Sequence, residues 1–436
     1  MQEYQVLARK YRPKRFCEVI GQEAIVTTLK NSIAKHRLAH AYLFSGSHGT
    51  GKTTLARIFA KALNCKNPGQ DLEPCGVCPS CKEIGSGSSM DVLEVDGASH
   101  RGIDDIRTIN ETVSYSAPSG KYKIYIIDEV HMLTKEAFNA LLKTLEEPPE
   151  KVKFFFATTE AHKVPPTILS RCQHYTLNRI GSRQIIDKLS EISKELSVEV
   201  DPEALELIAR RAGGGLRDAE SLFDQLLCCH EGKISTESTA KLLGVMPQEV
   251  FFAIDQAGSA GNFMMAFTVV EQIWAEGKNL VHFVEMLTEH YRSLLLFQLG
   301  GDHGSVYGPK EALEASSKLY TKEQLLFLLE YLVQMQQEIR FAPSPKVMLE
   351  AILLKVLQSG QRIEVKDLLK RLAALEKKEP MEPPAPLPKP PAPQKIQEMP
   401  KPKPTPPQNP PVEPPKELDT VMQFAAVELE GTVQKR

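Results

Sequence analysis

The sequence lacks long apolar runs and has almost no net charge. Among its 436 residues no apolar stretch approaches the roughly 20 residues that cross a bilayer, and the N-terminus is polar and basic, without the apolar core of a secretion signal. We therefore expect a cytoplasmic protein with no membrane contact. The net charge of -2 gives no general attraction to nucleic acid, so any contact with DNA has to come from a local basic surface or from partner proteins.

The stretch from Gly46 to Thr53 has the pattern of a phosphate-binding loop. It follows an apolar run, residues 41–44, and precedes apolar residues at helical spacing, so the predicted order is strand, loop, helix. Backbone N–H groups of such a loop and the helix N-terminus bind phosphate, and this context disfavours a ligand-free turn. Lys52 is expected to reach the β- and γ-phosphates and the Thr53 hydroxyl to ligate Mg²⁺. The nucleotide-binding residues are then Gly46, Ser47, His48, Gly49, Thr50, Gly51, Lys52 and Thr53.

A second apolar run, residues 122–127, ends in Asp128 and Glu129. Carboxylates that follow a buried parallel strand lie at the edge of the sheet where ligands bind. Asp128 is expected to hold Mg²⁺ through water, and Glu129 to orient or activate the attacking water. An apolar strand followed by an acidic pair is common, but about 75 residues after a phosphate-binding loop the pair predicts a nucleotide hydrolase.

Further strands are predicted over residues 91–96 and 152–158, and helices over 22–36, 103–113 and 134–147. The run 152–158 ends in Thr158 and Thr159, which places polar groups at the same carboxyl edge. A short helix over 165–172 includes Arg171, which by itself is most simply a surface cation. The basic segment 7–16 has aromatic residues among its cations, so it could bind a base or a nucleic-acid backbone, or it could be a solvated arm.

Four of the eight cysteines lie close together in the sequence, at Cys65, Cys75, Cys78 and Cys81. In a reducing compartment such a cluster favours metal binding over disulfides. Cys75, Cys78 and Cys81 have two residues between each pair of neighbours, and Cys65 lies at the end of the preceding helix. Together they can close a tetrahedral site, so we expect structural zinc. The competing metal centre is an iron–sulfur cluster, which uses similar spacing. The alternative without metal is four free thiols, which is disfavoured because so many exposed thiols would oxidise.

Strand and helix patterns alternate up to about residue 178 and then give way to helices. We expect an α/β domain over 1–178, with a parallel sheet covered by helices on both faces and the cysteine module inserted at 65–81. A small helical domain is expected over 179–243 and an all-helical domain over 244–360. These three domains agree with the number that a chain of this length holds at roughly 150 residues each.

The composition changes near the C-terminal end of the sequence. Seventeen of the 31 prolines lie between Pro380 and Pro415. A charged and then proline-rich linker over 361–416 is therefore expected to be disordered and semi-rigid. The segment 417–436 has apolar residues on one helical face, as a docking peptide does, and a frayed chain end explains it equally well.

The order of the domains and several motifs resemble one family. An α/β nucleotide domain followed by a small helical domain with Gly215-Leu216-Arg217-Asp218 is the plan of AAA+ proteins. The chain is similar to the tau/gamma subunits of bacterial DNA polymerase III, the AAA+ ATPases of the sliding-clamp loader. The resemblance covers about residues 1–360. It depends on Leu7–Pro13, Val19–Gln22, the phosphate-binding loop, the cysteine insertion, Asp128–Leu133, Ala157–Thr159, Ser170–Cys172 and Gly215–Ala219.

The resemblance implies roles for further residues. Thr159 would sense the γ-phosphate, and Arg217 would contact the nucleotide from the helical lid, so that the lid angle depends on the nucleotide. Arg171 would be an arginine finger that acts in trans on the ATP of a neighbouring subunit. The adenine pocket would be lined by Tyr11, Arg12, Pro13 and Val19.

The resemblance also implies a cellular role. The helical third domain would be the collar of a hetero-pentamer that contains delta, delta-prime and further copies of this chain. ATP, with Mg²⁺, would drive opening and loading of the sliding clamp, and the assembled complex would grip primer-template DNA. Only about 20 residues follow the proline-rich linker, so polymerase or helicase contact stays open. The alternatives are an AAA+ branch-migration motor and a scaffold that does not hydrolyse ATP, and the intact nucleotide motifs argue against the scaffold.

Overall fold

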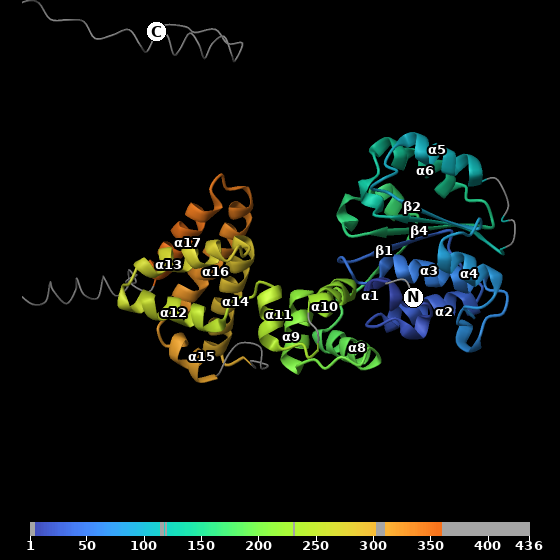
Figure 1. The fold of residues 1–436 in the computed structure, drawn as a ribbon. Coiled ribbons are helices and arrows are strands. Elements are labelled where there is room, and N and C mark those ends of the chain that lie inside the picture. The colour runs from blue at the N-terminus through green and yellow to red at the C-terminus, as the bar shows by residue number, and fades with distance from the viewer. Residues whose placement is uncertain (1–4, 114–116, 118–119, 230–231, 302–309, 360–436) are drawn as a thin grey trace, which may run out of the picture. The chain divides into compact units, whose positions relative to one another are not determined.

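The computed structural model describes residues 5–113, 117, 120–229, 232–301 and 310–359 (Figure 1). The predicted linker over 361–416 and the segment 417–436 lie outside the described residues. Within the described part, no helix combines the length and the apolar character needed to cross a bilayer.

A parallel sheet forms the centre of the N-terminal domain. Its five strands, among the described residues, lie in the order β2-β3-β4-β1-β5. Their bounds are β1 (Ala41–Ser45), β2 (Val92–Asp96), β3 (Lys123–Asp128), β4 (Val152–Thr158) and β5 (Gln173–Thr176). The register aligns Ser45 with Thr158, and Asp96 with Asp128, so the carboxyl ends of neighbouring strands meet at one edge. This edge is where the sequence places the phosphate-binding loop and the acidic pair.

Helices cover both faces of the sheet, as predicted (Figure 1). Successive side chains of a strand point to opposite faces. Phe155 accordingly packs with Leu55 and Phe59 on one face, whereas Phe154 packs with Leu141 on the other. The helices of the first face are α2 (Glu23–Ala34), α3 (Lys52–Asn64) and α4 (Pro79–Ser86), and those of the second are α5 (Ile103–Val113) and α6 (Lys135–Glu146).

Short elements complete this domain. They are α7 (Pro166–Leu169) and the 3₁₀ helices η1 (Phe16–Glu18), η2 (Gln70–Leu72), η3 (Val130–Met132) and η4 (Ala161–Lys163). The strand β5 is not among the predicted strands, because its four residues include no aliphatic side chain. It pairs with β1 at the edge of the sheet, and three of its four residues are exposed.

Four helices follow the sheet and enclose their own core. They are α8 (Ser182–Glu195), α9 (Pro202–Arg211), α10 (Leu216–Cys229) and α11 (Thr236–Leu242). The helix α1 (Leu7–Lys10) packs against α10, and Leu7 is buried in the core of these helices. Phe16, nine residues later, is buried in the sheet domain. The basic N-terminal segment is therefore anchored in two domains, and its interpretation as a solvated arm is wrong.

The remaining described helices form the predicted all-helical domain. They are α12 (Gln248–Ala260), α13 (Met264–Ala275), α14 (Leu280–Gln298), α15 (Lys310–Ser317), α16 (Lys322–Glu338), η5 (Ile339–Phe341) and α17 (Pro345–Ser359). A capping box starts α16, because Thr321 and Gln324 exchange hydrogen bonds. Inside the core, Asp255 accepts hydrogen bonds at 2.8 Å from His290 and 3.0 Å from Tyr320, so this buried carboxylate is partnered.

Candidate functional site

The glycine-rich loop between β1 and α3 has the backbone that its sequence predicts. Gly49 and Gly51 have φ of 71° and 95°, in the left-handed region that favours glycine. A side chain at Gly49 would lie 2.8 Å from Asp218 Oδ2, whereas the space beside Gly51 is open to 4 Å. The Lys52 ammonium donates to the carbonyl of Ser47 at 2.9 Å. The side chain of Lys52 is thus buried and bonded to the loop itself.

One cavity joins this loop to two other parts of the chain. The loop and β3 contribute the polar end, which includes Lys52, Thr53, Asp128 and Glu129. The N-terminal segment and the first helical domain contribute the other end. The residues of that end are Ala8, Arg12, Pro13, Val19, Ile20, Ile180, Leu216, Arg217 and Glu220. The cavity thus has one end suited to phosphates and one with an apolar wall suited to a nucleoside.

Two predicted Mg²⁺ ligands lie in contact at the polar end. Thr53 Oγ1 donates to Asp128 Oδ2 at 2.7 Å, and the other carboxylate oxygen of Asp128 accepts from the backbone N–H of Glu129 at 2.9 Å. A hydroxyl and a carboxylate beside a phosphate site are the oxygen ligands that Mg²⁺ takes in nucleotide hydrolases, so these residues fit the ion.

The side chain of Glu129 is fixed against the end of β4. Its Oε2 accepts from the backbone N–H and the hydroxyl of Thr159 at 3.2 and 3.1 Å. His131, whose side chain is 7% exposed, lies 3.3 Å from the same oxygen and 3.1 Å from Glu160. Thr159 thus contacts Glu129 and is not among the residues that line the cavity. The sequence did not predict the role of His131 in this arrangement.

Three cations, Arg12, Lys52 and Arg217, line the cavity together with three acids, Asp128, Glu129 and Glu220. Burial lowers the pKa of Lys52, and the carboxylates of Glu129, Asp128 and Asp218 oppose this shift. Burial also lowers the pKa of Arg12, and the nearby guanidinium groups of Arg57 and Arg217 lower it further. Lys52 and Arg12 are therefore partly buried cations beside carboxylates, and an anionic ligand in the cavity would stabilise their charged forms.

The two other predicted arginines lie in different places. Arg217 lines the cavity from the first turn of α10, and its backbone N–H lies 3.5 Å from the carbonyl of Gly49. Arg171 follows α7 and does not line the cavity of its own chain. Its guanidinium donates to Glu146 at 2.6 Å and to the carbonyl of Thr167 at 2.8 Å.

Three of the four residues predicted for the adenine pocket line the cavity, and the fourth does not. Arg12, Pro13 and Val19 line the cavity. So do Ile20 and the lid residues Ile180, Leu216 and Glu220, to which the sequence assigned no role in the pocket. Tyr11 lies outside this lining, because its ring packs on the core of the first helical domain. Its hydroxyl accepts a hydrogen bond from Lys10 at 3.1 Å.

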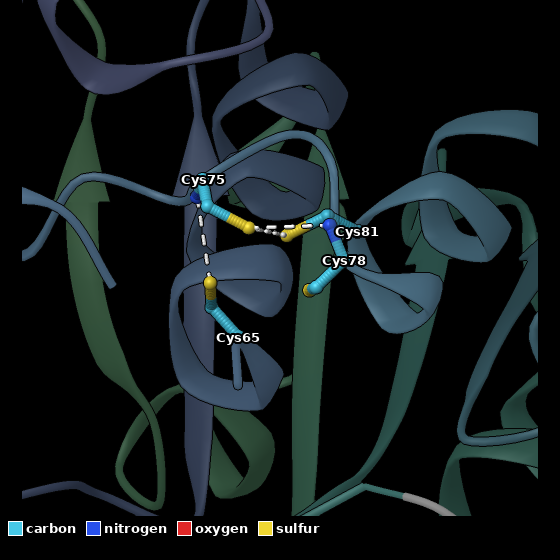
Figure 2. A group of neighbouring side chains, drawn as sticks. All are labelled: Cys65, Cys75, Cys78 and Cys81. Atoms are coloured by element: carbon cyan, nitrogen blue, oxygen red, sulfur yellow. Dashed lines mark hydrogen bonds between the residues drawn. The ribbon is translucent and has the colours of Figure 1, made fainter. Parts of the chain in front are cut away.

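The four predicted cysteines converge beside the end of α3, and their sulfur atoms all lie within 4.8 Å of one another (Figure 2). Cys75 Sγ lies 3.9 Å from Cys81 Sγ, close to the roughly 3.8 Å expected between two sulfurs of a tetrahedral zinc site. Backbone N–H groups of Cys78 and Val77 lower the pKa of Cys75 to about 6, whereas burial raises the pKa of Cys81. This donor set fits a closed metal site without a position for substrate.

Three family models match consecutive parts of the chain. Residues 21–181 match "DNA polymerase III, delta subunit", and residues 184–232 match "DNA polymerase III clamp loader subunit, ATPase lid domain". Residues 234–372 match "DNA polymerase III subunits gamma and tau domain III". The order of these matches follows the three domains of the fold.

Curated relatives extend along most of the chain. The DNA polymerase III tau subunit of Bacillus subtilis is 39% identical over 86% of this chain and 68% of its own length. That of Escherichia coli is 38% identical over 83% of this chain and 56% of its own length. The DNA polymerase III gamma subunit of Buchnera aphidicola subsp. Acyrthosiphon pisum is 37% identical over 82% of this chain and 99% of its own length.

Among solved structures, the Thermotoga maritima RuvB Holliday junction branch migration motor is 24% identical, with a TM-score of 0.40 over 57% of this chain and 78% of that chain. No functional argument follows from a match at this level. The family models and the relatives agree with each other and with the domain order. The chain therefore belongs to the tau/gamma family of DNA polymerase III, the clamp-loader ATPase subunits.

Proposed function

We propose that this chain binds and hydrolyses ATP in the cavity between the glycine-rich loop and the lid, and that this cycle opens a sliding clamp and loads it onto primed DNA. The observation that supports the proposal most directly is the meeting of Lys52, Thr53, Asp128 and Glu129 with Arg217 of the lid around one cavity. The presence of Lys52 and Thr53 together with Asp128 and Glu129 argues against a scaffold that does not hydrolyse ATP.

Each residue of the site then has a chemical role. Lys52 and the loop N–H groups neutralise the phosphates, and Glu129 orients the attacking water. Magnesium, held by Thr53 and Asp128, would neutralise charge that develops on the phosphates. Because Glu129 is hydrogen-bonded to Thr159, a γ-phosphate that engages the Thr159 hydroxyl would release the carboxylate for catalysis. Arg217 would move with the lid and so couple its angle to the bound nucleotide.

The chain would act in a hetero-pentamer with delta, delta-prime and further copies of itself in the cytoplasm. The helices α12 to α17 would form the collar, and primer-template DNA would be bound by the assembled complex. Contacts with polymerase or helicase are not part of this proposal.

The decisive experiment is clamp loading onto primed circular DNA with purified partner subunits. We expect loading with ATP and none without it, measured as clamp retained on the DNA after gel filtration. A branch-migration motor would instead move DNA junctions without any clamp. Junction movement together with ATP-independent clamp retention would contradict the proposal.

The four cysteines are proposed to hold one structural zinc ion. Metal analysis of the purified chain is expected to return one zinc per chain, and Cys78→Ser is expected to lose the metal and to lower the Tm, because a thiolate site of this kind stabilises the fold that presents it. Cys229→Ser, at an exposed cysteine outside the cluster, is the matched control and should keep both. Four titratable thiols without metal would exclude the site.

A further inference from the structure

Glu220 is a buried acid in the wall of the nucleotide cavity. It lies on α10, one turn after Arg217, and lines the cavity although only 4% of the residue is exposed. Its Oε1 atom is inaccessible and has no hydrogen-bond partner among the described residues. Glu220 directly follows the motif Gly215–Ala219 and belongs to none of the sequence motifs described above.

An unpartnered carboxyl at this depth destabilises the protein in the absence of a ligand. Burying a polar group without a hydrogen bond is unfavourable, and almost all buried side-chain polar atoms have partners. The two cations that act on Glu220 leave this oxygen unpartnered, because Lys188 pairs with Glu191 at 2.8 Å and neither Lys188 nor Arg12 donates to Oε1. A partner from a bound ligand would remove this penalty.

The position of Glu220 decides which part of the nucleotide would supply that partner. The charged groups that act on it are Lys188 and Arg12, and Lys52 of the phosphate end is not among them. A carboxyl would also repel phosphates. The cavity wall that includes Pro13 and Leu216 is apolar, so it suits the nucleoside half of ATP, which offers an exocyclic amine and ribose hydroxyls as donors.

We propose that Glu220 Oε1 accepts a hydrogen bond from an N–H or O–H donor of the nucleoside half of ATP, and that Glu220 is thereby a specificity-determining residue. The inference builds on the proposed function and adds to it the group that recognises the nucleoside. The donor is the adenine amine or a ribose hydroxyl, and both offer the same chemistry to the carboxyl oxygen.

The first test measures nucleotide affinity of the purified full chain by calorimetry. The nucleotides are ATP, 2′-deoxy-ATP, 3′-deoxy-ATP and purine riboside triphosphate, which lacks the amine. Glu220→Leu is expected to weaken ATP binding by roughly 3- to 10-fold, the value of one neutral hydrogen bond. Glu220→Gln keeps an acceptor and should stay close to wild type.

The analogues identify the donor. The analogue that lacks it should bind wild type more weakly than ATP does and should bind Glu220→Leu no more weakly than ATP does, because the two changes remove the same contact. If wild type binds ATP but Glu220→Leu binds all four nucleotides as wild type does, the inference is wrong. If wild type binds no ATP, the proposed function fails first.

The stability of the nucleotide-free protein gives a second test. Burial raises the pKa of Glu220 to about 7, against an ordinary value of 4.5, and the facing cations Lys188 and Arg12 only partly oppose this. Between these values the folded state binds more protons than the unfolded state, so the contribution of Glu220 to stability falls as the pH rises. The Tm of wild type should therefore fall more from pH 5 to pH 8 than that of Glu220→Gln. Equal falls would contradict the buried, unpartnered state of this acid.

A structural role and a binding role predict opposite changes in Glu220→Leu. If Glu220 only supported the fold, its replacement would lower the Tm of the nucleotide-free chain. Because the replacement removes an unpartnered polar group and keeps the apolar volume, we expect a higher Tm together with the weaker ATP binding. A lower Tm with unchanged ATP affinity would overturn the inference.

Discussion

Lys52→Ala is expected to abolish ATP hydrolysis by the purified protein and ATP-dependent clamp loading by the complex assembled with it. The Lys52 ammonium is buried at the rim of the glycine-rich loop and is bonded to the carbonyl of Ser47 within the same loop. In the proposed site its removal would leave the β- and γ-phosphates without the lysine that is expected to neutralise them. Phosphate release assays and calorimetric ATP titration measure the two losses separately.

The matched control for this variant is Lys61→Ala, on the same helix α3. Lys61 is partly buried but does not line the nucleotide cavity, so its replacement tests whether a lost α3 lysine by itself disturbs the domain. Hydrolysis should persist in Lys61→Ala. Normal clamp loading by a complex that contains only Lys52→Ala subunits would refute the assignment of the site.

Arg171→Ala is expected to keep ATP binding and to lose hydrolysis only in the assembled complex. An arginine finger supplied by a neighbour contributes roughly 10³ to 10⁵ in turnover number in phosphoryl transfer, so the loss should be of that order. In its own chain Arg171 is bonded to Glu146 and Thr167 and does not contact the cavity. The measurement compares ATP binding by the isolated chain with ATP turnover by the complex in the presence of clamp and primed DNA.

Two variants separate this role from a structural one. Glu146→Gln removes the charged partner of Arg171 but leaves the guanidinium, and it should retain turnover. Arg183→Ala removes an exposed cation of α8 and controls for the change in net charge. Weaker ATP binding by isolated Arg171→Ala would show that the residue acts within its own subunit, contrary to the proposal.

The sheet and the phosphate end of the site could be predicted because local sequence determines both. Apolar runs of β-branched and aromatic residues form β1, β3 and β4, and the polar residues that follow them reach one edge because parallel strands share direction. The cysteine cluster could be predicted equally well, since spacing alone allows Cys75, Cys78 and Cys81 to turn inward together.

The nucleoside end of the site could not be predicted in the same way, because tertiary contacts create it. Tyr11 is next to Arg12 in the sequence, yet the tyrosine ring packs against the core of the lid whereas the arginine lines the cavity. His131 lies 3.3 Å from Glu129, and this contact could not be predicted from the spacing of the two residues in the sequence. Glu220 did leave a signal, because it occupies the buried face of α10 between Leu216 and Phe223, where an acid is unexpected.

The position of β1 in the sheet has a consequence for how the protein is made. The strand lies between β4 and β5, with Ala41 beside Phe154 and Tyr42 beside Gln173. The ribosome releases the N-terminal part first, so β1 emerges long before either neighbour has been synthesised. A nascent chain that has grown only as far as Glu146 therefore exposes two unpaired edges of an apolar strand, which favour association with other chains. We expect the loop that follows β1 to be held in place only after β4 and β5, the two neighbours of β1, have been synthesised.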